Sequence, residues 1–224
     1  MKFIHTADIH LGAEPDAGSS YTAKRPEELW NSFERLLNIC EEEQTDLLLI
    51  AGDLFHRQPL LRELKELDYL FSRLTHTQVV LMAGNHDYLK STSYYRNYKW
   101  QGPVHMFLSQ KPACMEFKEL GVRIYGLSYE EREITEPLYE KILPEKRGIA
   151  SILLAHGGDE KHIPFRKNEL LKLGYDYIAL GHVHKPQKVP GCPKARYSGS
   201  PLPFNVRETS FDKQVIAVTL TAGS

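Results

Sequence analysis

Five short apolar runs in this sequence end in the same way, and this repetition restricts the fold more than any other feature. Each run has the length and the branched side chains of a buried strand. Each then finishes in small residues and presents polar side chains, which are Asp8 with His10, Asp53, Asn85 with His86, His156, and His182 with His184. Because an open α/β sheet builds its sites beyond the carboxyl ends of its strands, the pattern predicts an α/β fold with a site at one sheet edge.

The stretch Gly84-Asn85-His86-Asp87 shows the pattern most clearly. It follows the apolar run Val79 to Ala83 and places an amide, an imidazole and a carboxylate in successive positions. Asn85 could give a neutral oxygen to a cation and leave His86 free to protonate a neighbouring group. A Gly-Asn turn after a strand is also common without any metal, so the tetrapeptide alone leaves both interpretations open. The recurrence along the chain favours metal chemistry.

The periodicity of the chain predicts alternating strands and helices. Strands are expected over residues 1–8, 46–50, 79–83, 104–108, 114–118, 122–127, 149–155, 177–180, 196–200 and 215–220. Helices are expected from Pro26 to about Glu43 and over residues 60–74 and 168–173, with shorter helices over 91–100 and 137–143. Residues 12–24 are expected to form a loop. No repeat, low-complexity segment or linker divides the chain, so we expect one domain over residues 1–224.

Composition excludes several classes of protein. The formal net charge of −1 gives no bulk attraction for nucleic acid, so such a partner would have to be held by a local patch or by metal ions. The three cysteines are widely spaced, which argues for a reducing compartment and against a disulfide frame or a thiolate zinc site. No apolar run approaches the length of a bilayer span, and the amino terminus has no cleavable signal. We therefore expect a cytoplasmic protein without membrane contact.

Two of the strand ends carry a pair of potential ligands with one residue between them. These pairs are Asp8-x-His10 and His182-x-His184. In extended backbone this spacing points both side chains to the same side, so a pair can bind one ion. Taken singly, each pair also fits a turn carboxylate beside a surface histidine, and His156 alone also fits an ordinary core histidine. Five such coincidences at the same end of a strand make those interpretations improbable together.

The types of ligand indicate which metals would bind. Two carboxylates, several imidazoles and one amide, with no thiolate, suit Mn²⁺, Fe²⁺ or Zn²⁺, and we expect Mn²⁺ first. Seven protein ligands are too many for one catalytic ion that keeps an open position, but they are enough for two. Two divalent ions beside two ionised carboxylates leave the site positive. Such a site suits a phosphate, because two ions about 3.5–4 Å apart can clamp the attacking and leaving oxygens.

The order of these motifs resembles that of the calcineurin-like metallophosphoesterases. The resemblance rests on Asp8-x-His10, Gly52-Asp53, Gly84-Asn85-His86-Asp87, His156 and Gly181-His182-x-His184, and it covers essentially the whole chain. Three longer stretches, at residues 5–12, 53–56 and 197–203, are similar to the SbcD-type DNA repair exonucleases, including the YhaO-like branch. The resemblance implies a four-layer α/β/β/α sandwich with two central mixed sheets and a dinuclear metal site at one edge.

The resemblance also implies a role for each site residue. Asp8, His10 and His184 would serve the first ion, Asn85, His156 and His182 would serve the second, and Asp53 would bridge them. A metal-activated hydroxide would attack the phosphorus, and His86 would stabilise the pentavalent state or protonate the leaving oxygen. His56 matches a family histidine that touches the phosphate, and Asp87 is expected to orient His86.

The resemblance leaves the substrate and the partners open. The leading hypothesis is a DNA exonuclease and endonuclease that acts on ends or single strands. The alternatives are a stand-alone phosphodiesterase or phosphatase acting on a small metabolite, and a docking subunit with weak catalysis. Full-length members of this type continue into a DNA-capping domain and a segment that binds an SbcC-type ATPase. Nothing after Leu220 could supply either, so we expect neither domain here and an ATPase partner only in a longer form.

One cluster in the sequence could contact DNA directly. It combines aromatic and basic residues, which are Tyr94, Tyr95, Arg96, Tyr98, Lys99 and Trp100. Such a cluster could stack bases and follow a backbone. A helix packed on the core or on a second copy is an equally good interpretation. In the resembling nucleases, helices from this region form a dimer, so we expect a homodimer.

Overall fold

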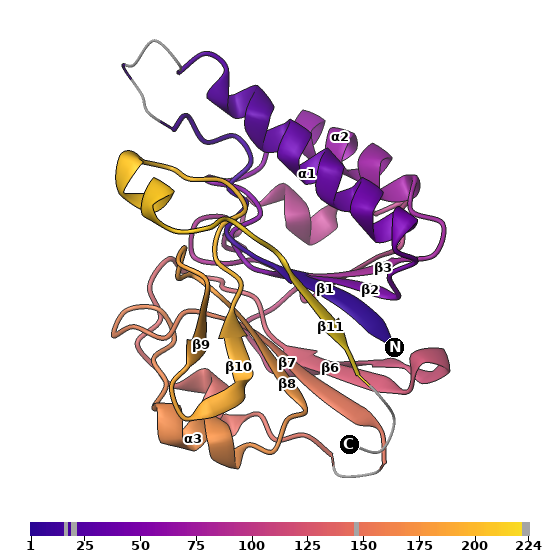
Figure 1. Cartoon of the computed structure of the whole chain (residues 1–224), viewed down its shortest axis with the longest axis vertical. Coiled ribbons are helices and arrows are strands. Elements are labelled where there is room, and N and C mark those ends of the chain that lie inside the picture. The colour runs from indigo at the N-terminus through magenta and orange to yellow at the C-terminus, as the bar shows by residue number, and fades with distance from the viewer. Residues whose placement is uncertain (16–17, 19–21, 146–147, 221–224) are drawn as a thin grey trace.

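The chain folds into four layers, with two sheets packed face to face between outer helices (Figure 1). The structure is a computed structural model that describes residues 1–15, 18, 22–145 and 148–220. Part of the loop expected over residues 12–24, namely residues 16–17 and 19–21, lies outside the described residues. The expected α/β sandwich with two mixed sheets is confirmed.

The first sheet joins strands from the two ends of the chain. Its spatial order is β11 (Ile216–Thr219), β1 (Lys2–Thr6), β2 (Leu47–Ala51), β3 (Gln78–Met82) and β4 (Val104–Met106). Strands β1 to β4 run parallel, whereas β11 pairs antiparallel with β1. Helices α1 (Arg25–Glu42) and α2 (Leu61–Ser72) cover the outer face (Figure 1). The apolar face of α1, with Leu29, Phe33 and Leu37, is buried as its helical spacing predicts.

The second sheet is built from the carboxyl-terminal half of the chain. Its order is β5 (Ala113–Phe117), β6 (Val122–Gly126), β7 (Ala150–His156), β8 (Tyr177–Gly181), β10 (Cys192–Tyr197) and β9 (Gln187–Val189). The four inner strands run parallel and the two edge strands antiparallel. The short helix α3 (Lys167–Lys172) contributes Leu170 to the core on the outer face of this sheet.

The layers explain why the central strands are apolar at every position. In β2, Leu47 and Leu49 point between the two sheets, while Leu48 and Ile50 point toward the helices. Each of these side chains is fully buried. Burial stabilises the fold by about 1.5–3 kcal/mol for each such side chain, and a strand buried on both faces therefore carries no polar alternation.

Several expected elements differ from the structure. Short 3₁₀ turns at Tyr94–Asn97 and Leu138–Lys141 stand in place of the helices expected over 91–100 and 137–143. Further 3₁₀ turns cover Lys118–Leu120 and Val206–Ser210. The expected strand over 196–200 instead spans Cys192–Tyr197, and β9 was not foreseen. The sequence of β9 is short and polar, so only its pairing with β10 makes it a strand.

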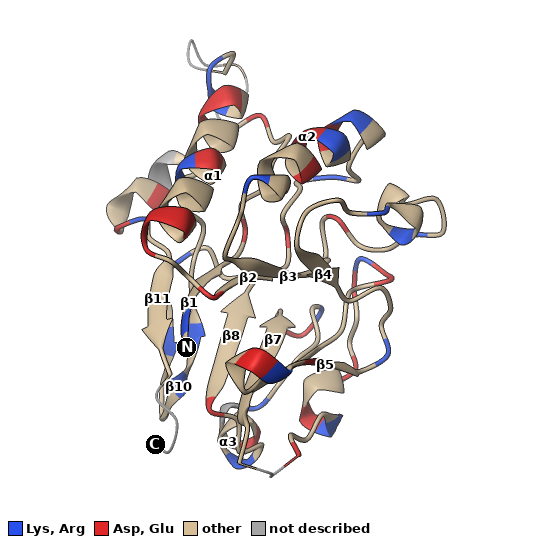
Figure 2. Cartoon of the chain, turned by 90° about the vertical axis from the view of Figure 1, so that its right-hand side faces the viewer, with Lys and Arg blue, Asp and Glu red and all other residues tan. Residues whose placement is uncertain are grey.

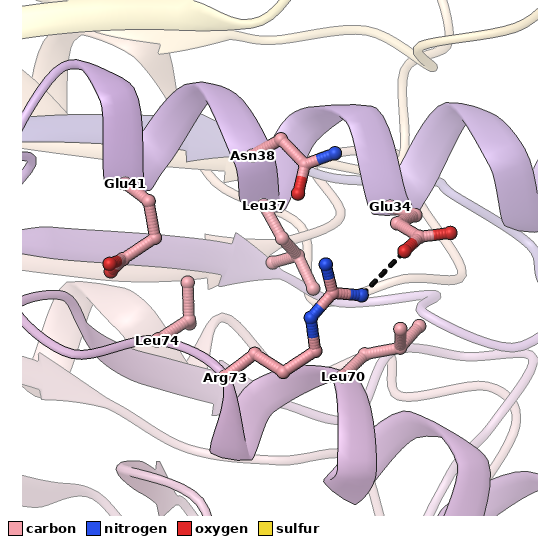
Figure 3. Close-up of a pocket in the computed structure, with 7 residues that line it drawn as sticks. All are labelled: Glu34, Leu37, Asn38, Glu41, Leu70, Arg73 and Leu74. Atoms are coloured by element: carbon pink, nitrogen blue, oxygen red, sulfur yellow. Dashed lines mark hydrogen bonds and ion pairs between the residues drawn. The ribbon is translucent and has the colours of Figure 1, made fainter.

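The outer helical layer is separate from the candidate site. A cavity of about 220 Å³ lies between α1 and α2, and Arg73 donates across it to Glu34 at 2.5 Å (Figure 3). None of the predicted ligands lines this cavity. Within the described residues, no helix combines the length and the apolar character that a membrane crossing requires.

Candidate metal centre

The carboxyl ends of five parallel strands from both sheets converge at one edge of the molecule. Strands β1, β2 and β3 lead into the loops of Asp8, Asp53 and Asn85, and β7 and β8 lead into His156 and His182. Backbone bonds join the loops: the amide of Asp8 donates to Gly52 at 3.2 Å, and the amide of His10 donates to Asp53 at 3.0 Å. All seven predicted ligands therefore meet at this edge.

One group of ligand atoms gathers around His10. The Nε2 atoms of His10 and His184 lie 3.1 Å apart, and Asp8 offers an oxygen to the same group, so that the three ligand atoms lie within 4.8 Å of one another. The backbone amide of His182 donates to both oxygens of Asp8, at 3.0 Å each. These two hydrogen bonds hold the carboxylate of Asp8 in place, and its remaining lone pairs are available to an ion.

A second group gathers around Asn85. Its Oδ1 lies 2.9 Å from Nε2 of His156 and 3.2 Å from Nδ1 of His182. The backbone carbonyl of Ala51 accepts a hydrogen bond from Nδ1 of His156 at 2.8 Å, which turns Nε2 toward Asn85. A carbonyl in this position is the usual partner of a metal-ligating imidazole.

Asp53 belongs to both groups. Its Oδ2 lies 3.4 Å from Nε2 of His156 and 3.8 Å from Nε2 of His10, while its Oδ1 accepts the backbone amide of His86 at 2.9 Å. The buried carboxylate thus lies between the two groups. This is the arrangement expected of a bridging ligand.

The donor set fits two divalent ions in spacing and in chemistry. Ligands about 2.1 Å from one ion are separated by about 3.0–3.4 Å from each other. The spacings of 3.1 and 3.2 Å fall within that range, and the spacing of 2.9 Å lies just below it. The residues present therefore suit the metals that the sequence predicts.

Several ligand residues have left-handed backbone conformations. The φ angles of Asp8, His10, Asp53 and His182 are 53°, 52°, 50° and 92°. Such conformations are uncommon outside glycine and cluster at functional sites, where surrounding contacts hold them. The strained turns direct these side chains to the end of the strands instead of to the faces of the sheets.

Two glycines leave the space that the ligands fill. A Cβ on Gly84 would lie 2.2 Å from Oδ1 of Asp53, and a Cβ on Gly52 would lie 2.4 Å from Nδ1 of His156. Gly52 also has a φ of +83°. The small residues that end the strands are therefore a condition for bringing carboxylates and imidazoles into contact.

Burial and neighbouring charges set the protonation of the centre. Burial raises the pKa of Asp8 to about 6. Burial opposes ionisation of Asp53 as well, but the charge and hydrogen bond of His156 hold its pKa well below the ordinary value. Burial disfavours the charged form of His156, but Asp53 and Asp8 outweigh this effect and raise its pKa to about 9. Without metal, a proton therefore resides on His156 between the carboxylates.

We expect Mn²⁺ to bind more tightly as the pH rises toward 9. A ligating imidazole must be neutral, so an ion has to displace the proton on His156. Below the pKa of that group the affinity should rise by up to about tenfold per pH unit. Titration calorimetry in buffers of different ionisation enthalpy measures the released proton. Equal affinities at pH 6 and pH 8 would contradict the assignment.

Two further histidines lie at the opening of the centre. Nδ1 of His86 donates to the backbone carbonyl of His56 at 3.0 Å, because a carbonyl can only accept, and this leaves Nε2 free. The rings of these two histidines lie 4.8 Å apart, and each is close to His10. The ring of Phe204 packs against His10 at 4.8 Å and His184 at 5.3 Å. The opening is thus lined by imidazoles and one aromatic ring.

The expectation that Asp87 orients His86 is corrected by the structure. Its carboxylate accepts hydrogen bonds from the backbone amides of Phe55 at 3.2 Å and Gly84 at 2.8 Å, and from the hydroxyl of Tyr95 at 3.1 Å. No hydrogen bond joins it to His86 among the residues that the structure describes. Burial and the charge of Asp53 raise the pKa of Asp87 to about 7. Asp87 therefore connects the loops that follow β2 and β3.

The aromatic and basic cluster mainly serves packing. Tyr95 is fully buried, and the hydroxyl of Tyr98 donates to Asp68 at 3.1 Å. The guanidinium of Arg96 donates to backbone carbonyls and to Glu130. Tyr94, which is 51% exposed, and Lys99 are the exposed members of the cluster. Of the two interpretations of this cluster, the structure supports a segment packed on the core.

Sequence reasoning missed two carboxylates beside the centre. Asp159 follows β7 by three residues, and Glu208 lies in the 3₁₀ turn Val206–Ser210. Each contacts a predicted histidine ligand: Asp159 contacts His182, and Glu208 contacts His184. Neither follows a strand directly. Glu208 lies outside any strand end, and Asp159 lies in an exposed turn beyond the two glycines that follow His156, so neither was singled out.

Comparison with known proteins gives consistent matches. A family model described as calcineurin-like phosphoesterase matches residues 1–186. The uncharacterized metallophosphoesterase YhaO of Bacillus subtilis is 32% identical over 243 residues, which cover 100% of this chain and 58% of the relative. The DNA double-strand break repair protein Mre11 of Methanopyrus kandleri is 29% identical, with coverage of 95% and 51%. The SbcD component of the SbcCD nuclease of Bacillus subtilis is 27% identical, with coverage of 100% and 67%. The chain thus spans about half to two thirds of these relatives.

Proposed function

The chain belongs to the calcineurin-like phosphoesterase family, a group of metal-dependent hydrolases, and on that premise we propose that it hydrolyses DNA phosphodiester bonds at a dinuclear metal site. One observation carries the dinuclear part of this proposal: Oδ2 of Asp53 lies near Nε2 of both His10 and His156. A carboxylate shared in this way brings two ions close together, as an in-line displacement at phosphorus requires.

The two groups of ligands divide between the ions. Asp8, His10 and His184 would hold the first ion, Asn85, His156 and His182 would hold the second, and Asp53 would bridge them. Bound divalent ions would supply Lewis-acid activation of water and neutralise charge on the phosphate. Seven ligands together with His86 also argue against a docking protein without catalysis.

Two histidines would act on the phosphate itself. Nδ1 of His86 is bound to the carbonyl of His56, so the protonated, imidazolium form of His86 carries its second proton on the free Nε2 and can donate it to the leaving oxygen. The imidazole of His56 is exposed beside it and can donate to a phosphate oxygen. These roles require no contact from Asp87.

DNA is the favoured substrate because two of the relatives are named for DNA repair or nuclease activity. A second candidate, a small phosphodiester, is favoured by charge. The formal net charge is −1, and acidic and basic residues are interspersed along α1 and α2 (Figure 2). A protein that holds a long DNA segment usually offers a basic face. Of the two basic residues of the aromatic cluster, Arg96 is already paired with Glu130, and Lys99 is exposed.

A substrate comparison separates these two candidates. Hydrolysis of single-stranded DNA, bis-p-nitrophenyl phosphate and cyclic nucleotides should be measured with Mn²⁺ and again with EDTA. A DNA phosphodiesterase should cleave DNA and turn over cyclic nucleotides weakly. The Asp53→Asn variant, purified in the same way, controls for a contaminating nuclease. Rapid turnover of cyclic nucleotides without DNA cleavage would support the second candidate.

A homodimer also remains a prediction. Tyr94 of the aromatic cluster is 51% exposed, and Tyr69 on α2 is 66% exposed, so each offers apolar surface to a second copy. Light scattering at increasing concentration should show twice the mass of one chain. A monomer at the highest concentration would contradict the prediction. An SbcC-type ATPase partner is proposed only for a longer form of the chain.

A further inference from the structure

Two histidines at the edge of the centre each use both ring nitrogens. His182 directs Nδ1 to Oδ1 of Asn85 and places Nε2 2.6 Å from Oδ2 of Asp159. His184 directs Nε2 to His10 and places Nδ1 3.0 Å from Oε1 of Glu208. In both cases one nitrogen faces the ligand groups and the other meets a carboxylate from a separate loop.

Resting on the proposed dinuclear site, we infer that Asp159 and Glu208 are positioning residues, one for each ion. An ionised carboxylate can only accept, so the nitrogen facing it carries the proton and the opposite nitrogen presents its lone pair to the ion. Such a carboxylate fixes the tautomer and the orientation of the ring and makes it a stronger ligand. Asp159 would serve the second ion through His182, and Glu208 would serve the first through His184.

Asp159 is held in place by its own turn. Its Oδ1 accepts the backbone amides of Lys161 at 2.9 Å and His162 at 3.1 Å, and Nδ1 of His162 lies 2.8 Å away. The side chain is 52% exposed, so replacing it leaves no cavity in the core. Asp159 therefore offers the cleaner test of the two.

Glu208 has a second task besides its contact with His184. Its Oε2 accepts the amide of Phe204 at 3.2 Å and the ammonium of Lys213 at 2.9 Å. These bonds hold the loop between β10 and β11, the yellow segment that lies beside the two sheets in Figure 1. Loss of Glu208 should therefore affect Phe204 as well as His184.

A competing interpretation is a third ion held by Asp159, His162 and His182. Their ligand atoms lie within 4.8 Å of one another. That site would need Nε2 of His182 to lack its proton while Nδ1 serves another ion. An imidazole that is bound on both nitrogens has lost both protons, which is costly without strong compensation. The stoichiometry of binding distinguishes the two interpretations.

The experiment is a calorimetric Mn²⁺ titration of the full chain and of Asp159→Asn and Glu208→Gln. The wild type should bind two ions. Each variant should lower the affinity for one ion by about 10–100-fold and change the affinity for the other by no more than about twofold. The substitution His184→Ala impairs the first position. In that background, Asp159→Asn should lower the affinity for the ion that remains. Glu160→Gln removes the same charge from the adjacent exposed residue and should change neither affinity.

A second readout reports the tautomer directly. Long-range ¹H–¹⁵N spectra of the wild type in EDTA should show the proton of His182 on Nε2, and this signal should change in Asp159→Asn. Two ions with unchanged affinity in Asp159→Asn would overturn the inference while leaving the proposed function intact. Three ions in the wild type, reduced to two by His162→Ala, would overturn it in favour of the third site. No bound Mn²⁺ in the wild type would overturn the dinuclear site itself.

Discussion

Asp53→Asn should abolish the binding of both ions and all hydrolysis above the level seen in EDTA. Oδ2 of Asp53 lies 3.8 Å from Nε2 of His10 and 3.4 Å from Nε2 of His156, so one oxygen serves both groups. Its negative charge would lie between the two ions. A neutral amide there leaves two dications to repel each other across a buried site.

The substitution is chosen to leave the fold intact. Asparagine has nearly the same shape, can still accept the amide of His86 through its oxygen, and tolerates the left-handed φ of 50° at this position. Asn cannot hold the proton on His156 as a carboxylate does. The melting temperature in EDTA should therefore fall modestly, whereas the stabilisation by Mn²⁺ should disappear.

Metal analysis and Mn²⁺-dependent melting curves test this prediction. Asp68→Asn is the matched control, because Asp68 is also buried but binds the amides of Gln101 and Gly102 away from the centre. That variant should retain two ions. A metal content near two per chain in Asp53→Asn would refute the bridging role.

The seven predicted ligands could be expected to meet because each follows a strand or its first turn. The apolar runs identify the strands, and parallel strands end at the same edge, so residues such as Asp8 and His156 come together without knowledge of the turns. The glycines at these ends were equally visible. The steric reason for these glycines is seen only in the structure, where a Cβ on Gly84 would collide with the carboxylate of Asp53.

The carboxylates that support the histidines could not be located in this way. Asp159 reaches His182 through a turn closed by its own side chain, and Glu208 reaches His184 from an irregular loop. No periodicity marks either position. The misassigned role of Asp87 has the same origin: adjacency in sequence suggested contact with His86, whereas the turn directs its carboxylate to Phe55 and Gly84.

The helix expected over residues 91–100 was wrong for a different reason. A run containing Tyr95, Tyr98 and Trp100 is compatible with a helix, with a binding surface or with core packing. The side-chain bonds decided the outcome: Asp68 accepts the amides of Gln101 and Gly102, and Asp87 accepts the hydroxyl of Tyr95. These side-chain bonds hold the segment in an irregular path with one short 3₁₀ turn.

His86→Ala should retain both ions and lose about 10²–10⁴-fold in the turnover of DNA, the usual contribution of a general acid. His86 meets the centre through its backbone amide, which donates to Asp53, and alanine keeps that amide. The imidazole is partly exposed, and its Nδ1 is bound to the carbonyl of His56, so only Nε2 faces a substrate. Metal analysis and steady-state kinetics measure the two effects separately.

The leaving group decides how His86 acts. The 3′ or 5′ oxygen of DNA leaves as a poor, strongly basic group that needs a proton, whereas p-nitrophenolate leaves without one. If His86 is the acid, His86→Ala should impair DNA cleavage far more than hydrolysis of bis-p-nitrophenyl phosphate. Equal losses would assign the residue to stabilising charge on the phosphorus. His76→Ala, which removes an exposed histidine paired with Asp46, is the control and should leave both rates unchanged. Near wild-type hydrolysis of DNA by His86→Ala would place the acid elsewhere.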